Sequence, residues 1–135
     1  MSAQDPTQVE LHLPRRRRLV RVARKTAWHL AHCSDFTIDD VFDIELAVGE
    51  ACTNAMEYAC GEGRQEVVLR FAVDAERLVV EVRNRGRAFD PDRDTELSQE
   101  GGLGLQVIRA VMDEVEVREE AGCCCVRMVK LRKVR

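Results

Sequence analysis

Two polar side chains stand four residues apart in a segment that is otherwise largely apolar. The segment reads EACTNAMEY, and it contains Glu50 and Asn54. Residues four apart share one face of a helix, yet Asn is a poor interior helix residue because its amide competes for backbone hydrogen bonds. A carboxylate can act as a general base, and an amide oxygen suits a magnesium ion that also holds phosphates. Taken alone, the pair is more typical of a solvated helix face.

A second polar group follows a predicted strand in VRNRGRAFDP, residues 82–91. Asn84 stands where the apolar alternation ends, and Gly86 permits close backbone approach. That geometry can hold a flat base against a glycine while one polar group binds the edge of the base. A simple turn from strand to loop is the plainer interpretation of this piece by itself.

Glycines open a third segment, GGLGLQVIRAVMDEV, residues 101–115. The exposed N–H groups at a helix N-terminus are a natural phosphate site. The segment is not a Walker A motif, since no GK[ST] follows, and it is not a Rossmann fingerprint, since no GxGxxG follows a strand. A glycine loop that caps a helix without any ligand is an equally good interpretation when the segment is considered alone.

The elements that must position these residues follow from apolar periodicity. A helix from about Pro14 to His32 precedes a second helix, which Thr37 caps and Gly61 and Gly63 end. The polar stretch 84–102 is long for a structureless loop and is typical of a lid or binding segment. The remaining pattern predicts strands at 9–13, 67–73 and 78–82, a helix at 103–112, and a final hairpin of 115–118 with 124–131. This order predicts an α+β sandwich with helices on one face of a mainly antiparallel sheet.

Composition narrows the class of protein. A length of 135 residues favours one domain spanning residues 1–135. The net charge of −3 argues against direct nucleic-acid binding through bulk charge. No apolar run approaches the roughly 20 residues of a membrane span, and the N-terminus lacks a signal pattern, so we expect no membrane contact and a cytoplasmic location. None of the six cysteines forms a CxxC pair, which favours apolar fillers over a zinc site.

In this order and at this spacing, the three segments resemble the N box and the two glycine boxes of the GHKL ATPases (gyrase, heat-shock chaperone, histidine kinase and MutL relatives). The forms ELAVGEACTNAMEYA and EGGLGLQVIRAVMDEV are more specifically similar to the anti-sigma factor serine kinases of the RsbW/SpoIIAB type. The resemblance covers about residues 9–132. It implies a Bergerat-type, two-layer fold that binds ATP between the sheet-backed helices and a flexible lid.

The resemblance also implies roles for individual residues. Asn54 is similar to the magnesium-ligating Asn of the N box, and Glu50 to the base that activates an acceptor hydroxyl. Gly86 matches the glycine near the adenine, while Gly102 and Gly104 match glycines whose backbone meets the phosphates. The implied nucleotide contacts are Asn54, Asn84, Gly86, Ala88, Gly102, Leu103, Gly104 and Leu105.

Two residues depart from the family pattern. The family usually has Asp reading the adenine amino group, and this chain has Asn84. Its amide oxygen still accepts a hydrogen bond but without charge assistance, which weakens nucleotide binding by about 1–2 kcal/mol. A later glycine of the box is Ala88 here, which stiffens the predicted lid.

The function implied is an ATP- and Mg²⁺-dependent serine/threonine protein kinase. Its partners would be a STAS-type anti-sigma factor antagonist, which it phosphorylates, and a sigma factor, which it sequesters, and it would form a homodimer. The alternative is a nucleotide-gated or nucleotide-free module that sequesters a partner without phosphorylating it, which Asn84 and Ala88 keep open. A histidine-kinase catalytic domain is a weaker interpretation, because no dimerisation and phosphoacceptor helix is predicted before the ATPase segment.

A basic stretch, RRRRLVRVARK, spans residues 15–25. A solvated helix face is the first interpretation. A surface complementary to an acidic partner is the second.

Overall fold

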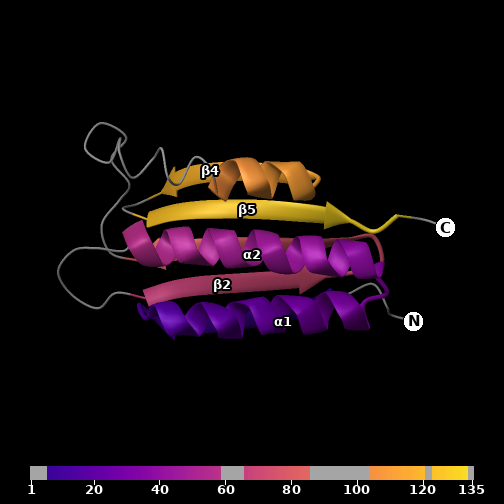
Figure 1. The fold of residues 1–135 in the computed structure, drawn as a ribbon, viewed down its shortest axis with the longest axis horizontal. Helices are drawn as coiled ribbons and strands as arrows, with labels where there is room; N and C mark the ends of the chain where they lie inside the picture. The colour runs from indigo at the N-terminus through magenta and orange to yellow at the C-terminus, as the bar shows by residue number, and fades with distance from the viewer. Residues whose placement is uncertain (1–5, 59–65, 86–103, 121–122, 134–135) are drawn as a thin grey trace.

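The computed structural model describes residues 6–58, 66–85, 104–120 and 123–133 (Figure 1). A short helix over residues 104–111 precedes β4. The named elements are, in chain order, β1 (Thr7–Pro14), a 3-10 turn (Arg17–Leu19), α1 (Val20–Cys33), α2 (Ile38–Tyr58), β2 (Glu66–Val73), β3 (Arg77–Arg85), β4 (Glu114–Glu120) and β5 (Cys123–Leu131).

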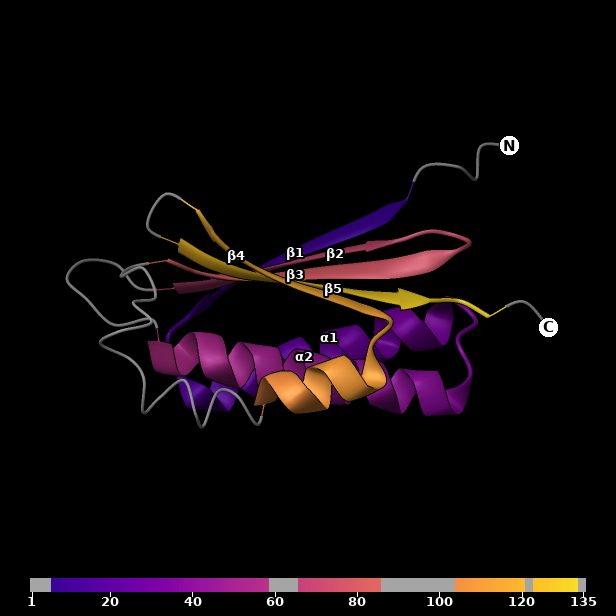
Figure 2. The ribbon, with the colours of Figure 1, turned by 90° about the horizontal axis from the view of Figure 1, so that it is seen from above.

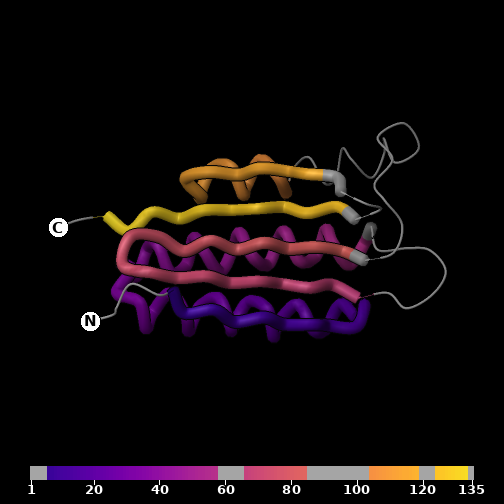
Figure 3. The backbone as a smooth tube through the Cα atoms, turned by 180° about the vertical axis from the view of Figure 1, so that it is seen from behind, coloured from indigo at the N-terminus to yellow at the C-terminus, as the bar shows by residue number. Residues whose placement is uncertain are grey.

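The strands form one antiparallel sheet in the order β1-β2-β3-β5-β4. All the described helices lie on the same side of it, so the molecule has two layers (Figure 2). Seen from behind, the strands lie in front of the helices with no helix over their outer face (Figure 3). The predicted α+β architecture with helices on one face is confirmed.

The core lies between these layers. Alternate residues of β2 and β3 face the helices, and Leu69, Phe71 and Val80 are almost fully buried. The apolar stripe of α2 meets them through residues such as Ile44 and Val48, which have no exposed surface. Each such side chain stabilises the fold by about 1.5–3 kcal/mol relative to an exposed one. This burial fixes which face of α2 turns away from the sheet.

Side-chain hydrogen bonds fix the start of α2 and the turn between β2 and β3. Thr37 caps α2 as predicted, because its Oγ1 accepts a hydrogen bond from the Asp40 N–H at 3.2 Å. The hairpin between β2 and β3 closes at Asp74, whose Oδ1 accepts from the N–H groups of Glu76 at 2.7 Å and Arg77 at 3.0 Å. These hydrogen bonds lower the pKa of the Asp74 carboxyl.

The start of α1 was predicted wrongly. Pro14 ends β1, where it pairs with Glu66, and the helix begins only at Val20. A proline fits there because β1 is an edge strand, on which a missing N–H need not break the ladder. The strands also extend one to three residues beyond their predicted bounds. One result is that Asn84 lies within β3 rather than after it.

The outer face of the sheet bears a row of charges that crosses all five strands. The paired residues along the row are Glu10, Arg70, Glu81, Arg127 and Glu116, so the charges alternate in sign. The Arg70 Nε lies 2.9 Å from Glu10 Oε2. Opposite charges directly across a ladder stabilise it by about 0.2–1 kcal/mol per pair, and the row therefore favours the observed register.

Two of the cysteines in the described residues are buried fillers, as predicted. Cys52 and Cys125 are buried, and burial raises the pKa of the Cys52 thiol to about 12. Cys33 differs, since it is exposed at the end of α1. Within the described residues, no group of His, Cys, Asp and Glu side chains is arranged to hold a metal ion. No helix in this part of the chain is long and apolar enough to cross a membrane.

Candidate functional site

Glu50 and Asn54 lie on the side of α2 that faces the start of the helix over residues 104–111. Their neighbours Ala51, Cys52 and Ala55 are buried, while both polar side chains are half-buried. The apolar stripe of α2 is therefore what aims the carboxylate and the amide in one direction. The side chains lie between α2 and the start of that helix and are not part of the core.

Gly104 places the backbone of a second element against this pair. A Cβ on residue 104 would lie 2.9 Å from Asn54 Nδ2 and 3.4 Å from Glu50 Oε2. The first distance is shorter than real Cβ contacts, so only glycine fits without displacing Asn54. Three residues predicted to share a site thus meet in the structure, although they come from segments about 50 residues apart.

The helix over residues 104–111 begins at this contact. Ile108 is fully buried and Leu105 packs against the core, so the helix is held to the sheet by its apolar side. Its first N–H groups have no partners within the helix and carry the positive end of its dipole. The site therefore combines a carboxylate, an amide and a helix N-terminus. Gly102 and Leu103 lie outside the described residues.

Asn84 is built into the sheet. It lies on the inner face of β3 and is only 2% exposed. Its Oδ1 accepts a hydrogen bond from the Cys124 N–H of β5 at 3.0 Å. A carbonyl oxygen can accept two hydrogen bonds, so one acceptor position is left for a further donor. Gly86 and Ala88, the other residues predicted near the adenine, lie outside the described residues.

Two arginines of the basic stretch bind the last turn of α2, close to the site. Neither interpretation of this stretch from the sequence predicted that contact. Arg15 donates through Nε to the Met56 carbonyl at 2.5 Å and through its guanidinium to the Glu57 carbonyl at 3.4 Å. Arg17 pairs with the Glu57 carboxylate at 2.8 Å. These arginines bind the last turn of α2, just after Asn54. The one feature of the sequence that could have predicted this contact is the general preference of basic side chains for the C-terminus of a helix.

A groove of about 320 Å³ runs along the helices to Glu50. Its walls come from α1 and α2 and include Arg24, Glu45, Gly49 and Thr53. At its far end, Phe42 and Leu46 lie on the same ridge of α2 as Glu50, at intervals of four residues. They are 56% and 45% exposed. An apolar surface thus adjoins the carboxylate.

The sequence matches a known class of protein. Over residues 13–130 the chain matches the histidine kinase-like ATPase domain, and it is a member of that class. Within the class, the chain belongs to the family of serine-protein kinase RsbW. It is 34% identical over 134 aligned residues to RsbW of Halalkalibacterium halodurans, covering 90% of this chain and 82% of the relative. It is 35% identical over 127 residues to RsbW of Bacillus subtilis, covering 84% and 79%.

Solved structures agree on the fold. The RsbU and RsbW domains of a Mycobacterium tuberculosis protein superpose with a TM-score of 0.72 at 17% identity, covering 95% of this chain and 33% of that one. The histidine kinase domain of a blue-light activated kinase from Erythrobacter litoralis gives a TM-score of 0.59 at 23% identity, covering 83% and 60%. At these identities the similarity shows a common fold.

The contact at Gly104 gives a direct test of the site. In Gly104→Ala the new methyl group displaces the Asn54 amide, and we expect nucleotide affinity, measured by calorimetry, to fall roughly ten- to a hundredfold. The free energy of unfolding should change by less than about 1 kcal/mol, because Ala favours a helix. Gly49→Ala is the matched control, since its methyl group meets only the flexible Arg24 side chain. Equal affinities in both variants and the wild type would remove residue 104 from the site.

Proposed function

We propose that the chain is an ATP-dependent protein serine/threonine kinase whose site is formed by Glu50, Asn54 and the start of the helix over residues 104–111. The main support is the close approach of Gly104 to both side chains. Phosphoryl transfer requires positioning and charge stabilisation more than covalent chemistry. A carboxylate, an amide oxygen and free backbone N–H groups within a few ångströms provide both.

The residues present fit ATP and Mg²⁺. The missing side chain at residue 104 lets the start of the helix approach the Asn54 amide closely, where an added methyl group would collide with it. Asn54 supplies a hard oxygen ligand of the type that Mg²⁺ takes together with phosphates. The N–H groups at the start of the helix would bind phosphate oxygens. When bound, Mg²⁺ would neutralise part of the charge on the phosphates.

Glu50 would serve as the base. The partner's Ser or Thr hydroxyl would lose its proton to the Glu50 carboxylate as its oxygen forms a bond to the γ-phosphorus. The bond from that phosphorus to the bridging oxygen would break, and ADP would leave. Glu50 is half-buried and borders the groove along α1 and α2, so a hydroxyl from another protein can reach it.

The groove beside Glu50 is where we place the phosphorylated partner. Phe42 and Leu46 would contact an apolar part of that protein, and the groove would lead its hydroxyl to the carboxylate. Exposed apolar patches next to polar groups mark interaction sites. As the resemblance to anti-sigma factor serine kinases implies, the substrate would be a STAS-type anti-sigma factor antagonist. A sigma factor would be the second partner.

The role of Glu50 can be separated from docking. Glu50→Gln keeps the size of the side chain but removes its basicity, so we expect ATP binding to be retained while transfer to the antagonist falls by roughly 10²–10⁴-fold. Transfer is measured with radiolabelled ATP, and binding by calorimetry with and without Mg²⁺. Phe42→Ala is the control for docking and should raise KM for the antagonist while leaving ATP affinity unchanged. Transfer by Glu50→Gln at the wild-type rate would exclude Glu50 as the base.

One observation favours a second candidate function, a partner-sequestering module without kinase activity. The Asn84 oxygen is already engaged by the Cys124 N–H, and the side chain lacks the negative charge usual in the family. Adenine binding would then rest on a single neutral hydrogen bond. Such a bond contributes about 0.5–1.5 kcal/mol, roughly half of what a charged acceptor contributes.

Asn84→Asp distinguishes the two candidates. The carboxylate keeps an acceptor for Cys124 and adds a charged oxygen, so ATP affinity should rise about 5- to 30-fold, equivalent to about 1–2 kcal/mol. Calorimetry gives the affinity, and a thermal melt checks that the buried charge has not unfolded the protein. A folded variant that binds ATP no better than the wild type would place the adenine elsewhere. Absence of ATP binding in both would favour the sequestering module.

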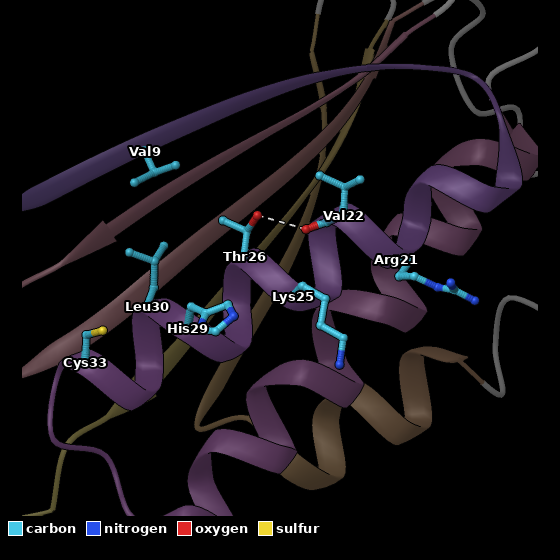
Figure 4. Close-up of a pocket in the computed structure, with 8 residues that line it drawn as sticks. All are labelled: Val9, Arg21, Val22, Lys25, Thr26, His29, Leu30 and Cys33. Atoms are coloured by element: carbon cyan, nitrogen blue, oxygen red, sulfur yellow. Dashed lines mark hydrogen bonds between the residues drawn. The ribbon is translucent and has the colours of Figure 1, made fainter.

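We also propose a homodimer that forms along β1 and α1. β1 lies at the edge of the sheet, so its outer backbone groups have no strand partner within the described residues. A groove of about 620 Å³ lies between this strand and α1 (Figure 4). The groove is lined mainly by apolar carbon from Val9, Val22 and Leu30, with Lys25 and His29 at its rim (Figure 4). A second copy would cover both features, which is a known use of an exposed strand edge.

Val22→Asp tests the dimer, because Val22 is 41% exposed and a charge there costs the monomer little. Sedimentation should give a dimer for the wild type and a monomer for the variant at the same concentration. Arg18→Ala is the control, since Arg18 is exposed and is not among the residues that line the groove. A wild-type protein that is monomeric at all accessible concentrations would reject the proposal.

A further inference from the structure

The positive end of Lys130 is buried between the sheet and the helical layer. The residue lies near the end of β5, opposite Leu78 and on the inner face of the sheet, and it is only 5% exposed. Lysine is almost never buried to this extent unless its charge is compensated. The groups around Nζ therefore indicate how a lysine is accommodated at this buried position.

Three acceptors from two helices surround Nζ. Asp40 Oδ1 lies 3.6 Å away and Asp43 Oδ2 3.5 Å away, both on the first turns of α2. The third acceptor is the carbonyl of Val111, the last residue of the helix over residues 104–111, to which Nζ donates a hydrogen bond. A cation at this end of a helix also interacts favourably with the helix dipole. We call these four residues the Lys130 cluster.

The Lys130 cluster lies at the opposite end of that helix from the candidate site. The helix runs antiparallel to α2, with Gly104 against Glu50 and Asn54 at one end and Val111 linked to Asp40 at the other (Figure 1). It has only two turns, and a helix that short does not hold its conformation alone. Buried apolar side chains such as Ile108 fix it laterally. The hydrogen bond from Lys130 to the Val111 carbonyl adds a directed contact at the end of the helix.

We propose that Lys130 is a positioning residue for phosphoryl transfer: by binding the end of the helix over residues 104–111 to the start of α2, it sets how close residue 104 comes to Glu50 and Asn54. The proposal rests on the proposed function, since those residues form the nucleotide site. A displacement of about 1 Å at a catalytic site can cost about a hundredfold in rate. A buried ion pair contributes little net stability compared with apolar residues, which is consistent with a role in placement.

The test is the double variant Lys130→Met/Asp40→Asn, which removes both buried charges together and leaves neither one unpaired. We expect kcat for transfer to the antagonist to fall roughly 10–100-fold, with KM for the antagonist unchanged because the docking groove is untouched. Hydrogen exchange should become faster at the amides of residues 104–111 and stay as it was in α1. Asp39→Asn is the matched control, since it removes an exposed charge from the same helical turn and should leave all three readouts unchanged.

Each of the other outcomes decides for or against the role proposed for Lys130. A folded double variant with wild-type kcat and wild-type exchange overturns the proposal, as does an equal loss in Asp39→Asn. If the double variant does not fold, Asp43→Asn replaces it, because that side chain is 38% exposed and can be changed without burying an unpaired carboxylate. A smaller loss of kcat with faster exchange at 104–111 then supports the proposal, and wild-type behaviour overturns it. If the wild type transfers no phosphate, the proposed function has failed, and the exchange measurement alone decides whether Lys130 places the helix.

Discussion

The approach of residue 104 to α2 is the constraint on which the rest of the site depends. There is no room for a side chain between the backbone of that residue and the Asn54 amide. Three contacts hold the two elements in place. The apolar stripe of α2 orients Glu50 and Asn54, and Ile108 holds the short helix to the sheet. Arg15 binds the last turn of α2. A site formed in this way is rigid where the polar groups meet and open where a partner protein would arrive.

Local patterns predicted most of the elements and singled out the segments of the candidate site. Apolar patterns with periods of two and of about 3.6 residues identified the strands and α2, because burial against one face imposes those periods. The glycines after residue 100 predicted a helix start. Glu50 and Asn54 indicated a functional site because they are polar, share one helix face and lie beside an apolar stripe. That these segments meet in space was implied by the resemblance to a known family and not by any local pattern.

The misses have a common physical cause, which is that long-range contacts leave little trace in local sequence. Pro14 has the φ angle of a helix start, yet β1 pairs with β2 through it. Asn84 looked like the end of a strand, but Cys124 pairs opposite it and extends β3. Arg15 belonged to a run of like charges, and only the fold brings the end of α2 beside it. Lys130 sits in an ordinary strand pattern, and its burial depends on two helices that are distant in sequence.

The row of charges on the outer face of the sheet has a consequence for how copies of the chain can meet. From either edge the row reads negative, positive, negative, positive, negative. The order of signs is the same from both ends of the row. Two sheets stacked face to face about a two-fold axis centred on the row therefore place like charge opposite like charge. This holds both for an axis along the row and for an axis across it. Such a stack is repulsive, although each charge has an opposite charge on the neighbouring strand within one sheet. The open face can therefore lie exposed on every copy without promoting self-association, which leaves symmetric contacts to the strand edge and the helical layer.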